Sequence, residues 1–428
     1  MKTKLIRSLT ILGVLSVLAA CAQVGKIFRG PPPAAAPLAL WVECQGDRKT
    51  LDAPERIDAL VEDAKRMGVD VLFAQVYRGG LAWYRSDRVD SPSWLAAGFD
   101  PLGYLLSKAK DAHIEVHAWI NVFSLSSNAE APVLKRLGED ILTRDNFGRL
   151  VAAYADGRAP ADPGSKESPA GSQFLIDAPG LWLDPGIPEV REFQLGIVRE
   201  LLEKYPALNG VHLDFIRYPY ALPVRPLSSL GVGIDFGYAE QALARFEKET
   251  GKKAPLANQD LSGASGFDSW RREQVTKFVE EASRLAKDQK RRLSVAALAW
   301  ADRAYLSAFQ DWRGWLESGL IDAALVMNYS RDKNLARHVG RAALAAGEAA
   351  PSGQGAWIGL GAYLFQDGPD PLLAQMKEAA SLRAPRIVLF SYDAIAGSES
   401  LKKALSVYSG DLARERLKAE EYQDFRDR

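Results

Sequence analysis

A histidine and an aspartate stand two residues apart near the middle of the chain. The run Gly210–Phe215 favours a β-strand, and the Arg-Tyr-Pro sequence that follows does not continue a sheet interior. Because strand side chains alternate, His212 and Asp214 share one face and the apolar residues share the other. Asp214 is therefore predicted at the carboxyl end of a strand, where a carboxylate can take part in catalysis. The alternative is that Asp214 only forms an ion pair with Arg217.

Polar and aromatic side chains also lie at or just after the ends of the other strand-like segments. They are Trp41, Glu43, Gln75, Tyr77, Arg78, His117, Trp119, Asn121, Trp300, Asp302, Asn328, Tyr329, Ser391 and Asp393. In a closed barrel of parallel strands these residues would meet at one mouth. Carboxylates and amides bind hydroxyl groups, and aromatic rings stack on the C–H faces of pyranoses, so this mixture indicates a sugar site.

Hydrolysis of a glycosidic bond usually needs two carboxyl groups. They stand about 5 to 5.5 Å apart when configuration is retained and about 6.5 to 9.5 Å apart when it is inverted. Asp214 is the first candidate, and Asp302 is the favoured partner. The alternatives are Glu43, Asp393 and Asp184, although Asp184 begins an Asp-Pro-Gly sequence that is typical of a turn.

Each of these candidates also has a structural explanation. Asp302 can pair with the arginine that follows it, and Glu43 can hold Arg78 or a loop backbone. Asp393 can cap a helix. His117, which lies on a predicted strand, can be a structural hydrogen-bonding residue and not a base.

Strand-like runs alternate with amphipathic helical patterns from Ala39 onward. The predicted strands are Ala39–Cys44, Val69–Tyr77, Glu115–Val122, Gly210–Phe215, Leu293–Ala299, Ile321–Tyr329, Ala356–Ala362 and Arg386–Tyr392. The predicted helices are Pro54–Met67, Pro101–Ala112, Pro188–Lys204, Tyr238–Thr250, Asp268–Gln289, Tyr305–Glu317, Lys333–Glu348, Pro371–Leu382 and Glu399–Tyr408. Eight βα units predict an α/β fold, a TIM barrel with long loops after strands three and four. A doubly wound sheet would need a Gly-rich phosphate turn, which the chain lacks.

The N-terminus has the pattern of a bacterial lipoprotein signal. Three basic residues precede the apolar run Leu9–Leu18, which is too short to span a bilayer, and Leu18-Ala19-Ala20-Cys21 resembles a lipobox. We therefore expect residues 1–20 to be a signal peptide and Cys21 to carry lipid, the alternative being a plain secretory signal. Ala22 resembles the outer-membrane sorting signal, so the expected location is the bacterial cell envelope, in the outer membrane and facing the periplasm.

The composition of the remainder is that of a globular protein. Residues 21–38, rich in proline and alanine, are expected to form a tether, residues 39–410 the barrel domain and residues 411–428 a charged tail. Without the signal, 51 Lys and Arg stand against 54 Asp and Glu, so no nucleic-acid partner is expected. Only Cys44 then remains as a thiol, and with no histidine cluster we expect no disulfide, metal site or cofactor.

Four motifs, taken together and in order, resemble those of the glycosyl-hydrolase-like family ten. They are Leu40-Trp41-Val42-Glu43, His117-Ala118-Trp119-Ile120-Asn121, Trp182-Leu183-Asp184-Pro185-Gly186 and Gly210-Val211-His212-Leu213-Asp214-Phe215-Ile216-Arg217-Tyr218-Pro219. The resemblance covers about residues 39–395. It implies a TIM-barrel envelope protein, often lipid-anchored, in a family that includes peptidoglycan glycosidases acting on glycan strands without stem peptides. Many relatives carry a second aspartate where this chain has Phe215, so the resemblance does not assign the second catalytic group.

The sequence thus predicts a tethered glycoside hydrolase that acts on a bacterial envelope glycan, with peptidoglycan strands as the expected substrate and Asp214 and Asp302 as the catalytic pair. The predicted substrate-binding residues are Glu43, Gln75, Tyr77, Arg78, His117, Trp119, Asn121, Asp184, His212, Arg217, Trp300, Asn328, Tyr329 and Asp393. The alternative is an inactive glycan-binding or scaffolding lipoprotein. A proton-transfer or aldol-type barrel enzyme would need a strand-end lysine or a metal cluster, and neither is evident.

Overall fold

The computed structural model describes residue 33 and residues 35–154, 174–176, 178–223, 234–255 and 264–427. Eight parallel strands close into a barrel, in which each strand pairs with the next and the last pairs with the first. They are β1 (Leu38–Val42), β2 (Val69–Arg78), β4 (Glu115–Asn121), β8 (Gly210–Asp214), β10 (Arg292–Leu298), β11 (Ala323–Met327), β12 (Gly355–Gly361) and β13 (Ile387–Phe390). The predicted TIM barrel is confirmed, and each predicted strand overlaps one of these.

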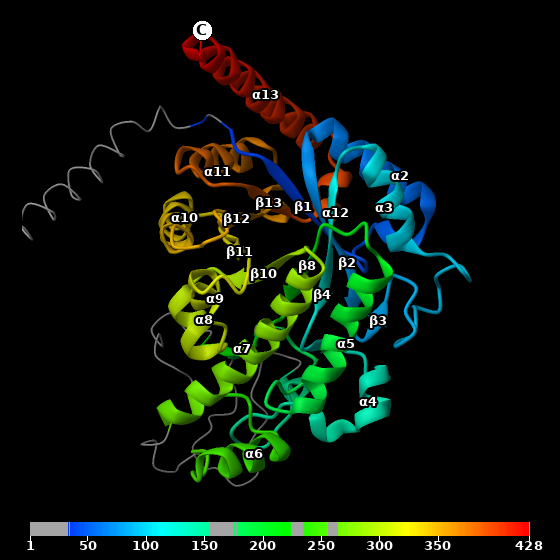
Figure 1. Ribbon diagram of the computed structural model, residues 1–428, viewed down its shortest axis with the longest axis vertical. Helices are drawn as coiled ribbons and strands as arrows, with labels where there is room; N and C mark the ends of the chain where they lie inside the picture. Colours follow the sequence, from blue (N-terminus) through cyan, green and yellow to red (C-terminus); the bar gives the residue numbers. More distant parts are fainter. Residues whose placement is uncertain are drawn as a thin grey trace, which may run out of the picture.

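Helices cover the outside of the barrel (Figure 1). They are α2 (Pro54–Met67), α3 (Pro101–Asp111), α5 (Pro188–Lys204), α7 (Ala264–Asp288), α8 (Ala301–Ser307), α9 (Trp312–Glu317), α10 (Lys333–Gly347), α11 (Asp370–Ser381), α12 (Tyr392–Ala396) and α13 (Glu399–Asp427). Proline begins α2, α3 and α5, where its missing N–H costs no helical hydrogen bond. The predicted helix Tyr305–Glu317 is divided into α8 and α9, because Asp311 caps a new helix by accepting a hydrogen bond from the Gly314 N–H.

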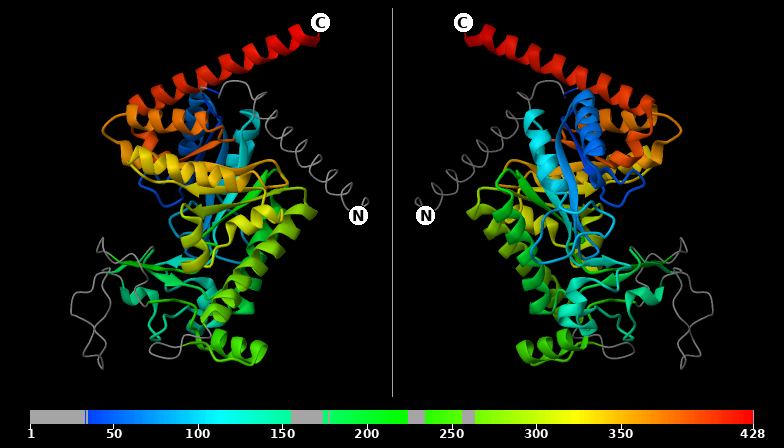
Figure 2. Two further views of the ribbon diagram at one scale, coloured as in Figure 1. Left: turned by 90° about the vertical axis from the view of Figure 1, so that its left-hand side faces the viewer. Right: turned by 90° about the vertical axis from the view of Figure 1, so that its right-hand side faces the viewer.

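Long connections follow β4 and β8, as predicted. They carry β5 (Ser124–Ser126), α4 (Pro132–Leu137), η2 (Glu139–Ile141), η3 (Val151–Tyr154), β6 (Phe174–Ile176), β7 (Leu181–Trp182), β9 (Ala221–Pro223) and α6 (Glu240–Thr250). Strand β5 pairs with β7 within the first connection, and β6 pairs with β9, which joins the first connection to the second. Figure 2 shows these segments, in cyan and green, at the end of the molecule opposite α13. The shorter connections contain η1 (Thr50–Asp52), β3 (Leu81–Ala82) and η5 (Ala362–Phe365).

Alternation along the strands divides the core in two. In β8, Val211 and Leu213 face outward and pack with the helices, while His212 and Asp214 face into the barrel. A smaller apolar cluster fills the barrel interior and includes Trp41, Phe73, Trp119 and Trp357. The predicted division of these faces is therefore present in the structure.

The body of the protein begins before the predicted boundary at Ala39. Ala35 and Ala36 are buried, and the Ala36 N–H donates to the Tyr408 hydroxyl at 2.8 Å. At the other end, α13 is one helix that continues through most of the predicted tail and projects from the barrel (Figure 1). Cys21 and the predicted signal lie outside the described residues. Within those residues, no helix has both the length and the apolar character needed to cross a membrane.

Candidate active site

A cavity of about 410 Å³ opens at the carboxyl ends of the barrel strands. Its lining includes Trp41, Glu43, Gln75, Arg78, Trp119, Asn121, Ser124, Ser126, Ser127, Asp214, Phe215, Arg217, Met327, Tyr329 and Phe390. A second cavity of about 490 Å³ shares part of this lining and adds Trp300, Asn328 and Tyr363. The two cavities form one strand-end cleft, in the position where TIM-barrel enzymes carry their active sites.

Asp214 is the last residue of β8 and is 8% exposed in the cleft. Its Oδ2 accepts a hydrogen bond from Nε1 of Trp119 on β4 at 3.1 Å. Its Oδ1 accepts from the backbone N–H of Phe215 at 2.7 Å. Phe215 has a φ of +50°, a left-handed conformation that ends the strand and is uncommon for a bulky residue. The two donors hold the carboxylate in one orientation and face its negative charge.

Glu43 follows β1 and lines the same cleft. Its Oε2 accepts a hydrogen bond from the Ser391 hydroxyl at 2.8 Å, and its Oε1 lies 3.9 Å from Nη1 of Arg78. Burial raises the pKa of Glu43 above 4.5 and Asp393 adds to the effect, although Ser391 and Arg78 oppose it. Glu43 is therefore a carboxyl group with increased proton affinity in the cleft that holds Asp214. Two carboxyl groups in such different surroundings are typical of an acid and its ionised partner.

A hydrogen-bonded network lies beside Glu43. Nε2 of Gln75 donates to Oδ1 of Asn121 at 3.1 Å, and the Cys44 thiol donates to Oε1 of Gln75 at 3.2 Å. Nη1 of Arg78 lies 3.5 Å from the same oxygen. Cys44 is buried, and burial raises the pKa of its thiol, which does not favour a nucleophilic thiolate. Gln75, Asn121 and Arg78 are thus brought together as predicted.

Aromatic rings surround the two carboxyl groups. Tyr329 stacks on Phe390 with ring centroids 5.5 Å apart, and Trp41 meets Phe390 edge-on at 6.0 Å. The guanidinium group of Arg217 lies 5.0 Å from the centroid of the Phe215 ring. Burial raises the pKa of Tyr329 well above 10, so its hydroxyl stays protonated and can donate a hydrogen bond. Such surroundings suit the faces and hydroxyl groups of a sugar.

The second cavity extends the cleft past Tyr329. Trp300 and Tyr363 line it and are 52% and 46% exposed, which is unusual for large aromatic side chains. Asn328 is also in the lining, but its Nδ2 donates to the carbonyl of Ala336 in α10 at 2.7 Å. The predicted Trp300 therefore lies where a ligand can stack on it, while the amide of Asn328 is already used by a helix.

His117 and His212 are in the barrel interior and line neither cavity, so the prediction that they bind substrate is wrong. Nε2 of His212 accepts a hydrogen bond from Nε1 of Trp41 at 3.0 Å, and its Nδ1 contacts the Ser294 hydroxyl at 3.0 Å. His117 packs against Phe73 with ring centroids 5.0 Å apart. Burial lowers the pKa of both imidazoles, which makes them neutral. They face inward as predicted, but they lie below the mouth.

Tyr77 does not reach the cleft, in contrast to the prediction. The register between β2 and β4 shifts between Gln75 and Tyr77, which marks a bulge. The bulge interrupts the alternation, so Tyr77 is buried in the outer core between the barrel and its helices. A period of two counted along the sequence cannot show such a shift.

Asp184 and Asp393 also lie outside the cleft, so their predicted contact with substrate is wrong. Oδ1 of Asp184 accepts hydrogen bonds from the Gly186 N–H at 2.8 Å and the Tyr218 hydroxyl at 3.1 Å, which is the turn role named as the alternative. Oδ2 of Asp393 accepts from the backbone N–H of Arg48 at 2.8 Å. Asp393 therefore holds the loop after β1 and does not cap α12.

Asp302 does not share a cavity with Asp214. Strand β10 ends at Leu298 and α8 begins soon after it, so strand alternation no longer applies at residue 302. The side chain of Asp302 is 94% exposed, lies 4.0 Å from Arg313 and borders a separate hollow between α8 and α9. The predicted pairing of Asp302 with Asp214 is therefore wrong, and Glu43, an alternative in the sequence, is the carboxyl group that shares the cleft with Asp214.

Some lining residues were not singled out in the sequence. They are Ser124, Ser126, Ser127, Met327, Tyr363 and Phe390. The serines come from the connection after β4, whose path no periodic pattern indicates. Met327 and Phe390 end β11 and β13, and a consistent reading of the inward positions of those strands would have found them. In the part of the chain that the structure describes, no three His, Cys, Asp or Glu side chains gather as metal ligands would.

Solved structures with the same architecture support the fold. The glycoside hydrolase domain of PgaB (BpsB) from Bordetella bronchiseptica superposes with a TM-score of 0.58 at 14% identity, over 87% of this chain and 98% of that domain. The catalytic domain of β-amylase from Paenibacillus polymyxa superposes with a TM-score of 0.53 at 12% identity, over 87% of this chain and 95% of that domain. At these identities the likeness concerns the fold alone.

The sequence itself is similar to two curated proteins. It is 26% identical over 289 residues to glycosyl hydrolase DigH of Escherichia coli K12, covering 62% of this chain and 55% of that protein. It is 25% identical over 286 residues to glycosyl hydrolase YngK of Bacillus subtilis strain 168, covering 61% of this chain and 46% of that protein. The chain thus matches about half the length of these relatives. A family model described as glycosyl hydrolase-like 10 matches residues 38–366, and the chain belongs to this family.

Proposed function

We propose that this protein is a glycoside hydrolase that cleaves O-glycosidic bonds in a polysaccharide of the bacterial cell envelope, with peptidoglycan glycan strands as its substrate. The observation that carries the proposal is the placement of Asp214 and Glu43 in one cleft with aromatic walls. Family membership and the names of the curated relatives support the same class of reaction. The motifs shared with glycosidases of peptide-free strands support the choice of substrate.

In this mechanism the two carboxyl groups have different roles. Asp214 carries the negative charge that stabilises the oxocarbenium-like transition state. Its two hydrogen bonds, from Trp119 and from the Phe215 N–H, keep it aimed at the sugar ring. Glu43 donates a proton to the leaving oxygen, because burial raises its pKa and keeps more of it protonated near neutral pH.

The extended cleft suits a polymer better than a small sugar. Tyr329 and Phe390 stand beside the carboxyl groups, and Trp300 and Tyr363 continue the aromatic surface into the second cavity. Each exposed ring offers a flat apolar face to a pyranose. We assign the first cavity to the sugars at the scissile bond and the second to sugars farther along the chain.

The test is hydrolysis of purified peptidoglycan glycan strands without stem peptides. The release of new reducing ends by the purified chain would support the proposal, and chromatography of the products would show where the strand is cut. Intact peptidoglycan and other envelope glycans serve as comparison substrates. A chain that binds these glycans but releases no reducing end from any of them would contradict the proposal and favour a glycan-binding lipoprotein.

Attachment to the outer membrane through Cys21 is part of the same proposal. It rests on the lipobox-like sequence and the Pro/Ala-rich segment that follows it. If lipid on Cys21 is the anchor, Cys21→Ser moves the protein from the membrane to the soluble fraction. Unchanged retention of the variant in membranes would contradict the anchor without affecting the glycosidase proposal.

A further inference from the structure

Arginines outnumber acids along the strand-end cleft. Among the described residues that line its two cavities, the charged side chains are Glu43, Arg78, Asp214, Arg217 and Arg303. The second cavity is the clearer case, because its charged lining residues are Arg217 and Arg303, and none of the described lining residues is Asp or Glu. The two carboxyl groups of the cleft already have roles in the proposed reaction. The positive charge therefore needs its own explanation.

Arg303 lies on the first turn of α8, three residues after Trp300, and lines the second cavity together with it. It is exposed, and among the residues that the structure describes its guanidinium group has neither an ion pair nor a hydrogen bond. The acid next to it in the sequence, Asp302, lies instead 4.0 Å from Nη1 of Arg313 and borders a separate hollow. The N–H groups of Arg303 are thus available to a ligand in the cavity.

Arg78 is the corresponding cation of the first cavity. It ends β2, and 28% of its side chain is exposed. Its Nη1 lies 3.9 Å from Oε1 of Glu43, too far for a hydrogen bond, and 3.5 Å from Oε1 of Gln75, while its Nη2 has no partner among the described residues. Because burial raises the pKa of Glu43, that carboxyl group neutralises Arg78 only in part. A carboxylate of the substrate can therefore bind Arg78.

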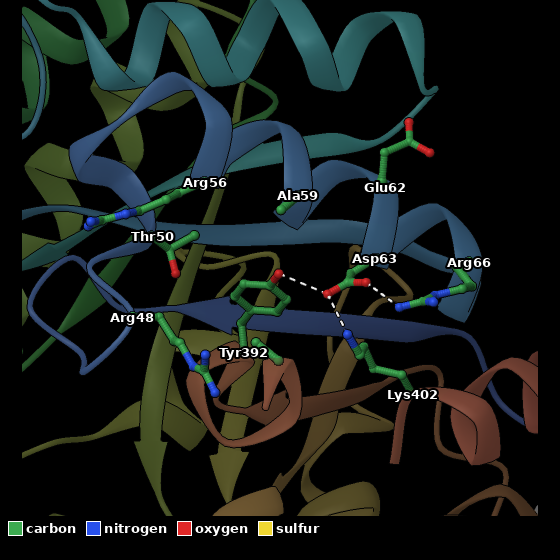
Figure 3. A pocket seen from close by; sticks show the side chains of 10 residues that line it. Arg48, Thr50, Arg56, Ala59, Glu62, Asp63, Arg66, Tyr392 and Lys402 are labelled. Atoms are coloured by element: carbon green, nitrogen blue, oxygen red, sulfur yellow. Dashed lines mark hydrogen bonds and ion pairs between the residues drawn. The ribbon is translucent and has the colours of Figure 1, made fainter. Parts of the chain in front are cut away.

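Two cations in another hollow of the protein have their counter-charges within the chain. Between α2 and the segment α12–α13, Asp63 accepts hydrogen bonds from Nζ of Lys402 at 3.4 Å and from Nη2 of Arg66 (Figure 3). Lys402 and Arg66 also form ion pairs with Glu399. Their charge is balanced by carboxylates of the protein itself, in contrast to the charge of Arg303.

Arg217 adds charge to both cavities but is not assigned a contact with the ligand. It is 3% exposed, and its guanidinium group lies among the rings of Trp182, Phe215 and Tyr220, 5.2, 5.0 and 5.7 Å from their centroids. Its charge acts on the cleft from this position, since Coulomb attraction is less screened where burial excludes water. Both cavities therefore favour a ligand with negative charge.

We propose that the cleft recognises free carboxylate groups of its glycan, with Arg78 binding the carboxylate of a sugar near the scissile bond and Arg303 that of a sugar farther along the strand. This proposal rests on the proposed function and adds the chemical group that selects the substrate. In peptide-free peptidoglycan strands every second sugar carries a lactyl ether with a free carboxylate, whereas a stem peptide converts that group into an amide. Guanidinium groups bind carboxylates through paired N–H donors. The cleft should therefore select strands whose carboxylates are free.

Strands that differ only in this charge test the proposal. Carbodiimide coupling with ammonia converts the carboxylates of peptide-free strands into amides and leaves the sugar chain unchanged. The wild type should hydrolyse the free strands with a KM about tenfold lower than that for the amidated strands. High ionic strength should narrow the difference, because salt screens exposed charges.

Variants of the two arginines should weaken this preference. Arg303→Gln should reduce it from about tenfold to about threefold, and Arg78→Gln should have a similar effect. Arg78 also acts on Glu43, but any effect through Glu43 is common to both substrates and cancels in the ratio of the two KM values. The double variant should show almost no preference.

Arg313→Gln and Arg66→Gln are the matched controls. Each removes one positive charge from a residue that lines neither cavity of the cleft. Arg313 has Asp302 as its partner, and Arg66 has Asp63 (Figure 3). Both variants should keep the preference of the wild type. Melting temperatures show whether each variant is folded.

Equal KM values of the wild type for free and amidated strands would overturn the proposal, as would an equal loss of preference in Arg303→Gln and Arg313→Gln. Binding is measured separately by calorimetric titration of Asp214→Asn with both kinds of strand, so that turnover does not interfere. Preferential binding of free strands without hydrolysis by the wild type would support carboxylate recognition and overturn the glycosidase function. Hydrolysis without preference would do the reverse, and no binding of either strand would overturn both.

Discussion

The upper and lower parts of the barrel interior are built from the same inward strand faces, but only the upper part is open to a ligand. At the top of β8, Asp214 faces a cavity and receives hydrogen bonds from Trp119 and from the backbone. Two residues lower on the same face, His212 is sealed beneath Trp41 and bound to it. The direction of a side chain is thus not enough to make it functional, because its height along the strand decides whether substrate can reach it.

The two levels also differ in charge. Burial lowers the pKa of His117 and His212, so both imidazoles of the lower interior are neutral, and the charges beside His117 are those of the Glu115–Arg292 ion pair. The upper interior holds two carboxyl groups, Asp214 and Glu43, and burial raises the pKa of Glu43. Mutation of polar groups in the upper part should therefore change turnover, whereas mutation of polar groups in the lower part should change stability.

The largest effect is expected for Asp214→Asn. The substitution keeps the size of the side chain and one of its two accepted hydrogen bonds, because an amide nitrogen cannot accept, and it removes the charge that stabilises the transition state. Turnover on peptide-free glycan strands should fall by at least ~10³, or about 4 kcal/mol of barrier, with little change in melting temperature. If Asp214 only holds Arg217, the variant should instead lose about 3 to 5 kcal/mol of unfolding free energy. A variant that melts much earlier but hydrolyses normally at low temperature would refute the catalytic role.

Glu43→Gln should have the next largest effect, a loss of about 10² in turnover, because an amide cannot donate the proton as a carboxylic acid does. In the wild type, activity requires protonated Glu43 and should decline as pH rises through its raised pKa. The variant should lack this alkaline decline. The pH profile of kcat tests this, and an identical decline in the variant would exclude Glu43 as the acid.

His117→Leu should change the pH dependence of stability and leave turnover within about twofold. The native imidazole is neutral because burial lowers its pKa, whereas the unfolded chain binds a proton below about pH 6.5. The unfolded state then holds more protons, so the unfolding free energy falls as pH drops, by up to about 1.4 kcal/mol per pH unit for this group. The variant should show a flatter slope between about pH 6.5 and 5 in denaturant titrations. An unchanged slope would show that His117 does not contribute.

Trp300→Ala tests whether the solvent-exposed part of the cleft binds substrate. Loss of one stacking face should raise KM about fivefold, or about 1 kcal/mol, and leave kcat within about twofold. The effect should be greater on long strands than on short oligosaccharides. Tyr305→Ala is the matched control, since Tyr305 is 41% exposed but lines the hollow outside α8 and not the cleft. Equal changes in both variants would argue against a binding role for Trp300.

Asp302→Asn should have the smallest effect. The side chain is 94% exposed and borders a hollow that is separate from the cleft. Turnover and melting temperature should both stay close to the wild-type values, because exposed ion pairs contribute little to stability. A loss of tenfold or more in turnover, in a folded variant, would restore Asp302 as a candidate for the second carboxyl group.

Local patterns in the sequence were sufficient to predict the helices and strands and the direction of most side chains on the strands. The predicted helix starts at Pro54, Pro101 and Pro188 coincide with the beginnings of α2, α3 and α5, and period-two alternation predicted that Trp119, Asn121 and Asp214 face inward. These features depend on neighbours within a few residues, since a strand or a helical turn is built from local geometry. The barrel followed from eight such units in succession.

The tertiary structure decided which carboxyl group stands with Asp214 and which inward residues the cleft reaches. The bulge in β2 turns Tyr77 outward, the end of β10 removes Asp302 from the mouth, and the connection after β4 brings serines to the cleft. Each of these depends on the pairing of strands that are far apart in the chain, on the residue at which each strand ends, and on the level up to which side chains fill the barrel interior. Such distances are set when the barrel closes, and no pattern within a single segment contains them.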